Sequence, residues 1–381
     1  MLELLFVLGV GLILYTYIGY PVLLKLMPRA EAPETTGSFT PAVTIIIAAY
    51  KGAASIKQKL DNTFDCDYPT DKIEVIVITD GSDDGTDSIV ESYPDTRVTL
   101  IRQIPRAGKT AAQKKGVDRA KYEILIFTDL TTMLEKQSIR ELVTNLEDPR
   151  IGLVSSQDIW VSPDGSVTES AQGAYVKYEM WLRDSESAIS SIVSASGCFY
   201  AVRKMFFEPI PDYLIDDTVI PLTVAQRHFR CIHWSKARSF VPMIPSVGRE
   251  FSRRARMTLG GINALMYKRQ LLNPFTYGFY SIQLWSHKML RWLVPFAMIA
   301  ALVANLCLAA QHPIGKWGIV ALAQIGFYSL AVVGFAKRNQ SSSPKVLRLI
   351  YFFVSSNLAL LLSWYEYFTS PKQTTWSESR G

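Results

Sequence analysis

The chain has 381 residues, a formal net charge of +6 and 49% hydrophobic residues. Cys66, Cys198, Cys231 and Cys307 show no CxxC spacing, so neither a zinc site nor a disulfide framework is indicated, and we expect reduced thiols in a cytosolic compartment. The excess Lys and Arg residues flank apolar segments and one amphipathic stretch, a pattern typical of contact with an anionic lipid surface. We therefore expect membrane lipid as a partner, and no nucleic acid.

Four uncharged segments approach or exceed the roughly 20 apolar residues that a membrane-spanning helix needs. They are residues 4–24, 294–315, 317–336 and 349–365. A cleaved signal peptide is the alternative for the first segment, but such peptides begin with a basic region. Here Glu3 precedes the segment, and Lys25 and Arg29 follow it. The charge asymmetry favours an uncleaved anchor.

Basic residues also set the expected orientation, because Lys and Arg near helix ends stay on the cytoplasmic side. They follow the first segment, precede the second, and fill the turn between the third and fourth: Lys25, Arg29, Lys288, Arg291, Lys337, Arg338, Lys345 and Arg348. All of them fall on one side if both termini are outside. We therefore expect a multi-pass protein of the inner (plasma) membrane with its large polar region in the cytoplasm.

The expected organisation has six parts. They are an N-terminal transmembrane helix (1–28), a linker (29–41), a cytosolic domain (42–245), an amphipathic interface region (246–286), three transmembrane helices (287–370) and a tail (371–381).

Within the cytosolic domain, apolar strand-like runs alternate with helical stretches. Strands are expected at residues 43–48, 74–78, 98–102 and 124–127, and helices at 54–63, 87–93 and 110–120. Strands buried on both faces and joined by helical crossovers predict an α/β fold, with a mostly parallel sheet and helices on both faces. Ligands of such sheets bind beyond the carboxyl ends of the strands, where this sequence has its acidic and glycine-rich loops.

The run YPTDKIEVIVITDGSDDGT at residues 68–86 resembles the nucleotide-sugar-binding end of family 2 glycosyltransferases of the GT-A fold. The resemblance covers most of residues 41–236, with several motifs in the family's order. It implies an inverting transferase of the hexosyltransferase class. Such an enzyme moves a sugar from a nucleotide-diphosphate donor, here a UDP-sugar, to a glycan acceptor at the cytoplasmic membrane face. The arrangement of spans resembles that of chitin-oligosaccharide, hyaluronan and cellulose synthases, which implies polysaccharide synthesis with export as an open question.

Two alternatives stay open at this point. One is a single-sugar transferase acting on a lipid-linked acceptor, and the other is a catalytically inactive scaffold of the same fold. Product length separates the first alternative from a polysaccharide synthase. Loss of turnover on Asp217→Asn separates both enzymes from the scaffold.

The resemblance assigns nucleotide-binding residues to three loops. Asp80 would accept the uracil imide N–H, Gly81 would let the backbone approach the base, and Ser82 would cap the next helix. A plain turn with an N-cap is the alternative for this loop. Ala48 and Tyr50 resemble the family's first nucleotide loop, and Lys109 resembles its Gly-Lys step, which places a cation near the nucleotide.

The family's metal motif, DxD, appears here in altered form as Asp129, Leu130 and Thr131. Two carboxylates one residue apart would point the same way and hold ribose and a divalent ion. Asp129 matches the first carboxylate, and Thr131 replaces the second with a weaker ligand. We still expect Mg²⁺ or Mn²⁺, because a leaving diphosphate needs its charge neutralised.

The acidic pair Asp216 and Asp217 resembles the family's catalytic step. By motif alignment Asp217 is the base that takes the proton from the acceptor hydroxyl, and Asp216 is its neighbour, which can raise the pKa of Asp217. A helix N-cap at Asp216 is the structural alternative. Gly197 and Cys198 resemble the acceptor strand, whose small residues let a sugar approach.

Residues 249–272 combine apolar residues at helical spacing with basic residues, which predicts an amphipathic helix lying in the membrane interface. Within this stretch Arg253 to Met257 resembles the QxxRW signature of processive synthases. Arg253 stands in the Gln place, Arg256 matches the diphosphate-binding arginine, and Met257 replaces the Trp. A membrane-binding role for these arginines is the alternative. His287, at the start of the second span, is assigned no chemistry.

Overall fold

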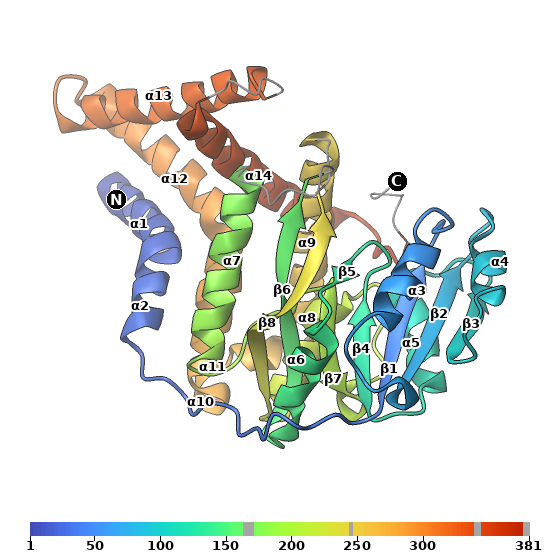
Figure 1. Ribbon diagram of the computed structural model, residues 1–381. Coiled ribbons are helices and arrows are strands. Elements are labelled where there is room, and N and C mark those ends of the chain that lie inside the picture. The colour runs from blue at the N-terminus through green and yellow to red at the C-terminus, as the bar shows by residue number, and fades with distance from the viewer. Residues whose placement is uncertain (163–170, 244–246, 339–343, 376–381) are drawn as a thin grey trace.

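In the computed structural model, a curled sheet stands beside a group of long apolar helices (Figure 1). The structure describes residues 1–162, 171–243, 247–338 and 344–375. Within these residues the sheet has eight strands in the order β3-β2-β1-β4-β7-β6-β8-β5. The strands are β1 (Val43–Ala49), β2 (Ile73–Asp80), β3 (Val98–Gln103), β4 (Ile124–Thr128), β5 (Met133–Leu134), β6 (Ile151–Val161), β7 (Phe199–Arg203) and β8 (Arg230–Pro242).

Strands β3, β2, β1 and β4 pair in parallel, as the alternating strand and helix pattern predicted. Strand β7 runs antiparallel to both β4 and β6, while β6 and β8 pair in parallel. The predicted α/β class with a mostly parallel sheet is confirmed. The antiparallel β7 is what brings a second set of loops to the carboxyl end of β4.

Helices cover both faces of the sheet because its strands are apolar on both sides. Ile45 and Ile47 of β1 pack with α3 (Ile56–Phe64), α4 (Thr86–Glu91) and α6 (Ser138–Thr144). Ile46 points to the other face, towards α5 (Lys109–Arg119), α8 (Asp216–Gln226) and α9 (Val247–Tyr267). This second face also receives Trp292 from an apolar helix, so the sheet domain and the apolar helices share one core.

Within the described residues, four helices are long and apolar enough to cross a membrane. They are Leu2–Leu26 (α1, Leu2–Leu14; η1, Tyr15–Gly19; α2, Tyr20–Leu26), Phe279–Gln311 (α11, Phe279–Gln283; η6, Leu284–Met289; α12, Leu290–Gln311), α13 (Lys316–Ala336) and α14 (Lys345–Thr369). Short helices α10 (Pro274–Tyr277) and η5 (Arg269–Leu272) precede the second of them. Large side chains such as Ile319 and Leu322 are 70% and 73% exposed, which is the composition expected of a lipid-facing surface. The four predicted spans are therefore present as candidate membrane helices.

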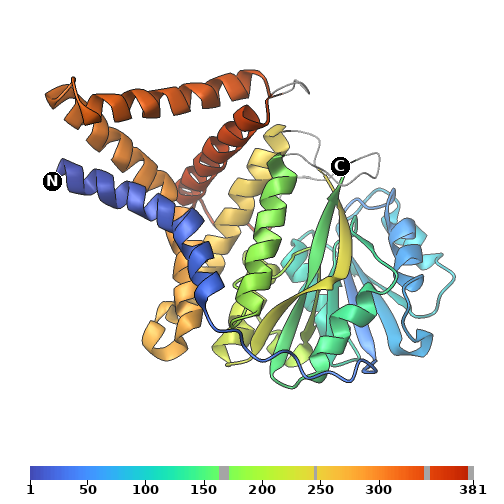
Figure 2. The same cartoon turned by 60° about the vertical axis from the view of Figure 1, so that its left-hand side comes forward.

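Helix α9 is packed on more than one side, and its predicted position in a membrane interface stays a prediction. A Cβ atom on Gly260 would be 2.8 Å from Ile215, and one on Gly261 would be 3.0 Å from Trp292. On another side Ser363 of α14 donates a hydrogen bond to the Ala255 carbonyl at 2.9 Å. The helix is therefore packed between the sheet domain and the apolar helices, as Figure 2 shows.

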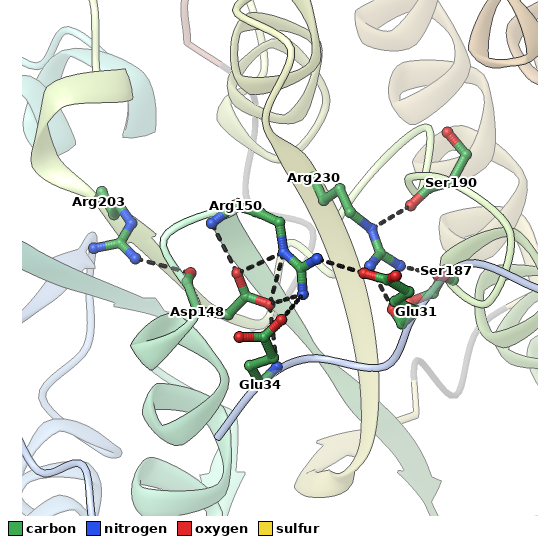
Figure 3. A network of polar contacts seen from close by, with 8 residues as sticks. All are labelled: Glu31, Glu34, Asp148, Arg150, Ser187, Ser190, Arg203 and Arg230. Carbon is green, nitrogen blue, oxygen red and sulfur yellow. Dashed lines mark hydrogen bonds and ion pairs between the residues drawn. The ribbon is translucent and has the colours of Figure 1, made fainter. Parts of the chain in front are cut away.

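The linker between α2 and β1 is pinned to the sheet domain (Figure 3). Arg150 pairs with Glu31 at 2.7 Å, Glu34 at 3.2 Å and Asp148 at 2.9 Å. Arg230 donates to the Glu31 carbonyl at 2.9 Å. The adjacent Arg150 guanidinium lowers the pKa of Asp148 to about 2. These contacts fix the first apolar helix relative to the sheet.

The segment that follows α14 returns to the sheet domain. Lys372 donates to the Tyr213 hydroxyl at 2.9 Å, and a Cβ atom on Gly108 would overlap the carbonyl oxygen of Thr374. Residues 370–375 therefore lie beside the sheet domain. This contact bears on the expected topology, in which the C-terminus lies on the opposite side of the membrane, and that topology stays a prediction.

Candidate active site

The carboxyl ends of β1, β2 and β4 carry the loops that the sequence singled out. Strand β2 ends at Asp80, whose carboxylate is almost fully buried. It accepts hydrogen bonds from Gln103 at 2.7 Å and from the backbone N–H groups of Ala107 and Gly108 at 2.8 and 2.9 Å. Asp80 thus fixes the loop that leads to Lys109. Its contact with a uracil ring stays a prediction.

The neighbouring loop residues surround this carboxylate. The Arg106 guanidinium lies 3.6 Å above the Tyr50 ring. Gly81 has φ +70°, and a Cβ atom there would be 3.0 Å from Arg106, so this position needs glycine for its conformation and its space. Ala48 is half-buried on β1. Tyr50 and Arg106 together offer a flat surface on which a base can stack.

Ser82 does not cap the next helix, so that prediction was wrong. Helix α4 begins at Thr86, and Gly85 occupies its N-cap position. The Ser82 hydroxyl instead accepts a hydrogen bond from the Lys51 N–H at 3.1 Å. Ser82 therefore joins the Asp80 loop to the loop after β1.

Lys109, the first residue of α5, connects three parts of the site. Its ammonium lies 2.9 Å from Asp129, 3.2 Å from the Gly197 carbonyl and 3.9 Å from Asp216. The predicted nucleotide, acceptor and acidic motifs therefore meet at one cation, although they are far apart in the sequence. A cation at this place can stabilise charge that develops on a leaving diphosphate.

Asp216 and Asp217 are the first two residues of α8, with Ile215 at the N-cap, so the alternative of an Asp216 N-cap is wrong. Asp216 is buried, and one of its oxygens accepts hydrogen bonds from the Tyr200 hydroxyl at 2.7 Å and Gln113 at 2.9 Å. Burial and then the neighbouring Asp216 raise the pKa of Asp217 to about 6, against the opposing effect of Lys109. A carboxyl with this pKa is suited to general base catalysis near neutral pH.

Gly197 lies directly against this carboxyl group. A Cβ atom at Gly197 would overlap Oδ2 of Asp217, so the glycine makes the room that the carboxylate occupies. The Cys198 carbonyl accepts from the Asp129 N–H at 3.0 Å. Ser196 donates to the buried Asp158 at 2.6 Å and orders the same segment. The predicted acceptor residues are therefore adjacent to the predicted base.

The residues at the altered DxD motif do not form a complete metal site. Asp129 is paired with the Lys109 ammonium, and Thr131 supplies a hydroxyl in place of the second carboxylate. No cluster of three His, Cys, Asp or Glu side chains suited to a metal ion occurs in the described part of the chain. This donor set does not fit a protein-built site for a hard divalent cation, which takes several oxygen ligands. A requirement for Mg²⁺ or Mn²⁺ stays a prediction.

A fully buried lysine contacts the turn that carries Asp129. Lys59 of α3 donates to the Thr128 hydroxyl at 2.8 Å and to the Thr132 carbonyl. Burial lowers the pKa of Lys59 to about 7. The turn that carries Asp129 is therefore held by side-chain contacts from both sides, with Lys109 above and Lys59 beneath.

The arginines of α9 lie at the membrane side of the domain. Arg253 pairs with Glu250 at 2.9 Å and lies 4.8 Å from the centre of the Trp160 ring. Trp160 packs with Cys198, so an aromatic side chain does stand near the predicted acceptor strand. The contacts with nucleotide predicted for Arg253 and Arg256 are not tested by this structure.

Sequence reasoning missed several side chains that shape the site. Tyr200 and Gln113 orient Asp216, Lys59 supports the Asp129 turn, and Arg183 of α7 (Ala171–Ser187) acts on Asp217, whose pKa it lowers. The buried polar residues on apolar elements were the available signal for Gln113 and Lys59. Nothing in the sequence relates Arg183 to Asp217.

Comparison with known proteins finds similarity to one family model over part of the sheet domain. Residues 44–208 match the model of "Glycosyl transferase family 2". The poly-beta-1,6-N-acetyl-D-glucosamine synthase of Staphylococcus aureus strain COL is 20% identical over 242 residues, which are 62% of this chain and 58% of that protein. Glycosyltransferase AglE of Haloferax volcanii is 25% identical over 183 residues, or 47% of this chain and 59% of that protein. The chain thus matches less than two thirds of the length of either relative.

Among solved structures, the mannosyltransferase PcManGT of Pyrobaculum calidifontis, in complex with GDP-Man and Mn²⁺, superimposes with a TM-score of 0.71. The match is 22% identical and covers 97% of this chain and 99% of that one. At this identity the likeness shows the fold, which extends over the sheet and the apolar helices alike.

Proposed function

We propose that this chain, which carries a glycosyl transferase family 2 domain on a GT-A fold, is an active inverting glycosyltransferase at a membrane. It would move a sugar from a nucleotide-diphosphate donor, a UDP-sugar by the Asp80 loop, to a glycan acceptor. The observation that carries the proposal is the carboxyl group of Asp217, whose pKa is raised to about 6 and which lies against Gly197. An inactive scaffold has no need of a carboxyl group held in this way.

In the proposed reaction Asp217 accepts the proton of an acceptor hydroxyl while that oxygen attacks the anomeric carbon of the donor. The bond from this carbon to the diphosphate breaks, and the diphosphate leaves with the electron pair. Asp216, held by Tyr200 and Gln113, is fixed beside the base. Lys109 lies 2.9 Å from Asp129 and is placed to stabilise the departing diphosphate.

The donor contacts are proposed from the loops at the sheet edge. Ala48, Tyr50, Asp80, Gly81 and Ser82 would bind the nucleoside, Asp129 its ribose and Lys109 its diphosphate, with Arg253 and Arg256 reaching from α9. A divalent cation, when bound, would add neutralising charge at the diphosphate. The altered DxD motif offers one carboxylate and one hydroxyl as ligands for this cation. The proposed reaction is therefore written so that it does not depend on the cation.

The membrane setting supports work at a lipid surface. Of the four candidate spans in the described residues, Phe279–Gln311 and α14 share a core with the sheet domain. The basic residues at the ends of the spans favour a cytoplasmic active site. We propose polysaccharide synthesis at that face, in line with the similarity to the staphylococcal poly-beta-1,6-N-acetyl-D-glucosamine synthase.

Release of nucleotide diphosphate by the purified protein in lipid, across UDP-, GDP- and other nucleotide sugars, tests this function. Release with one donor that is lost in Asp217→Asn would support it and identify the sugar. Asp118→Asn is the matched control, because Asp118 is an exposed carboxylate on α5. No release with any donor, with or without Mn²⁺ and with acceptor glycans present, would reject it.

A further inference from the structure

One face of α7 is directed at the second apolar helix and carries three charged residues. Glu179, Arg183 and Glu186 are spaced four and three residues apart, so they lie on the same side of the helix. In both views α7 stands between the sheet and the apolar helices (Figures 1 and 2). This face is therefore a boundary between the active site and the membrane.

The two glutamates on this face already have partners. His287 contacts Glu186 at 2.7 Å and Glu179 at 3.3 Å. Arg291 pairs with Glu179 at 2.5 Å, and the Tyr20 hydroxyl donates to Glu186 at 2.6 Å. These carboxylates are thus engaged by groups of the apolar helices.

Arg183, which lies between the two glutamates on this face, differs from them in its hydrogen bonding. Its Nε and Nη1 atoms are buried and have no hydrogen-bond partner among the described residues. Guanidinium N–H groups that are buried without an acceptor carry a desolvation cost, so a ligand or water is expected there. Arg183 is close enough to the catalytic side of the domain to lower the pKa of both Asp217 and Asp158.

A second cation lies on the membrane side of the same region. Lys288, in the second apolar helix, donates to the Ser194 hydroxyl at 3.0 Å. Ser194 precedes Ala195, whose N–H donates to the Asp217 carbonyl at 2.8 Å. The buried Asp158 on the other side is engaged by the hydroxyls of Ser196 and Ser239, at 2.6 and 3.0 Å. Two cations therefore lie near the base, at the level where a membrane helix enters the protein.

We propose that Arg183, assisted by Lys288, binds the phosphate group of a lipid-linked sugar acceptor. The inference rests on the proposed function and names its acceptor class. A guanidinium fork with unused N–H groups matches phosphate oxygens, and an ammonium adds a point charge. The donor loops lie at β1, β2 and β4, away from α7, so the donor diphosphate has its own cations there. A position at the start of an apolar helix fits a phosphate whose lipid chain stays in the membrane.

Asp217 is also the base in the proposed reaction on this acceptor. A hydroxyl of the phosphate-linked sugar gives its proton to Asp217, and its oxygen forms the bond to the donor's anomeric carbon. The bond between that carbon and the nucleotide diphosphate breaks, and the diphosphate takes the electron pair. The acceptor phosphate is unchanged, and the glycan on the same lipid phosphate is one sugar longer.

The test compares two acceptors that differ only in the phosphate. The protein in lipid nanodiscs receives its donor together with a polyprenyl-phosphate-linked sugar, or with the neutral alkyl glycoside of the same sugar. We expect Arg183→Met to raise the KM for the phosphate-linked acceptor by roughly 10-fold to 100-fold, because a hydrogen bond to a charged group is lost. The KM for the donor and the KM for the neutral glycoside are expected to stay unchanged, whereas kcat should change equally with both acceptors because Arg183 also lowers the pKa of Asp217. Arg183→Lys is expected to recover part of the loss.

Lys177→Met is the matched control, since Lys177 is an exposed cation on the same helix. Unchanged donor KM in Arg183→Met also excludes misfolding. The proposal would be overturned if Arg183→Met raised the KM for both acceptors equally. It would also be overturned if the wild-type protein had the same KM for both acceptors. Neither result would contradict the transferase activity itself. Absence of nucleotide-diphosphate release with every donor and acceptor would instead reject the proposed function itself.

Discussion

At the scale of single residues, the closeness of Asp216 and Asp217 predicts a specific pH dependence. A base works when deprotonated, so kcat/KM should fall as the pH drops through about 6, the raised pKa of Asp217. Asp216→Asn removes a neighbouring negative charge, which lowers the pKa of Asp217 and should move this acidic limb to lower pH. Steady-state rates over a pH range of about 4 to 8 would measure the shift. A limb that stays in place or moves upward would contradict the assigned roles, and Asp118→Asn should leave it where it is.

Thr131 makes a second residue-scale prediction, because it stands where a carboxylate would complete the DxD motif. Thr131→Asp adds a hard oxygen ligand one residue from Asp129, and is expected to tighten Mn²⁺ binding by about tenfold or more. Electron paramagnetic resonance of bound Mn²⁺ would measure the affinity directly, without relying on turnover. Thr131→Ser keeps the hydroxyl and serves as the control. Equal Mn²⁺ affinity in all three proteins would show that this position faces away from any bound cation.

At the scale of elements, the contact between α9 and the loop before α8 links the membrane side of the protein to the base. A Cβ atom on Gly260 would be 2.8 Å from Ile215, the residue before Asp216. Gly260→Ala should therefore lower kcat and the thermal stability in detergent, with about 1–3 kcal/mol lost to overpacking. Ile215→Ala in the same chain makes room and should restore part of the activity. Gly326→Ala, where the added atom meets nothing within 4 Å, should have no effect.

The elements that the sequence predicted best are those with a continuous apolar run. Strands β1 to β4 and helices α3 to α5 lie within about two residues of the predicted bounds, because β-branched runs and polar helical stretches alternate clearly there. The antiparallel β7 and the position of α7 depend on tertiary packing, which no local pattern encodes. The sequence could therefore predict that Asp80 and Asp129 lie at one sheet edge. It could not predict that Lys109 joins Asp129 to Asp216, or that Arg183 lies near Asp217.

At the scale of the whole molecule, the contact of residues 370–375 with the sheet domain predicts which side of the membrane they occupy. Because Lys372 contacts Tyr213, a cysteine placed at Gln373 should share a side with the active site. A membrane-impermeant maleimide should then label it in inverted vesicles and not in intact cells. Ser92→Cys in the sheet domain should behave in the same way, and Pro313→Cys in the turn between α12 and α13 should show the opposite pattern. Labelling of Gln373→Cys in intact cells would instead favour the orientation that the basic residues alone predict, with α14 crossing the membrane away from the active site.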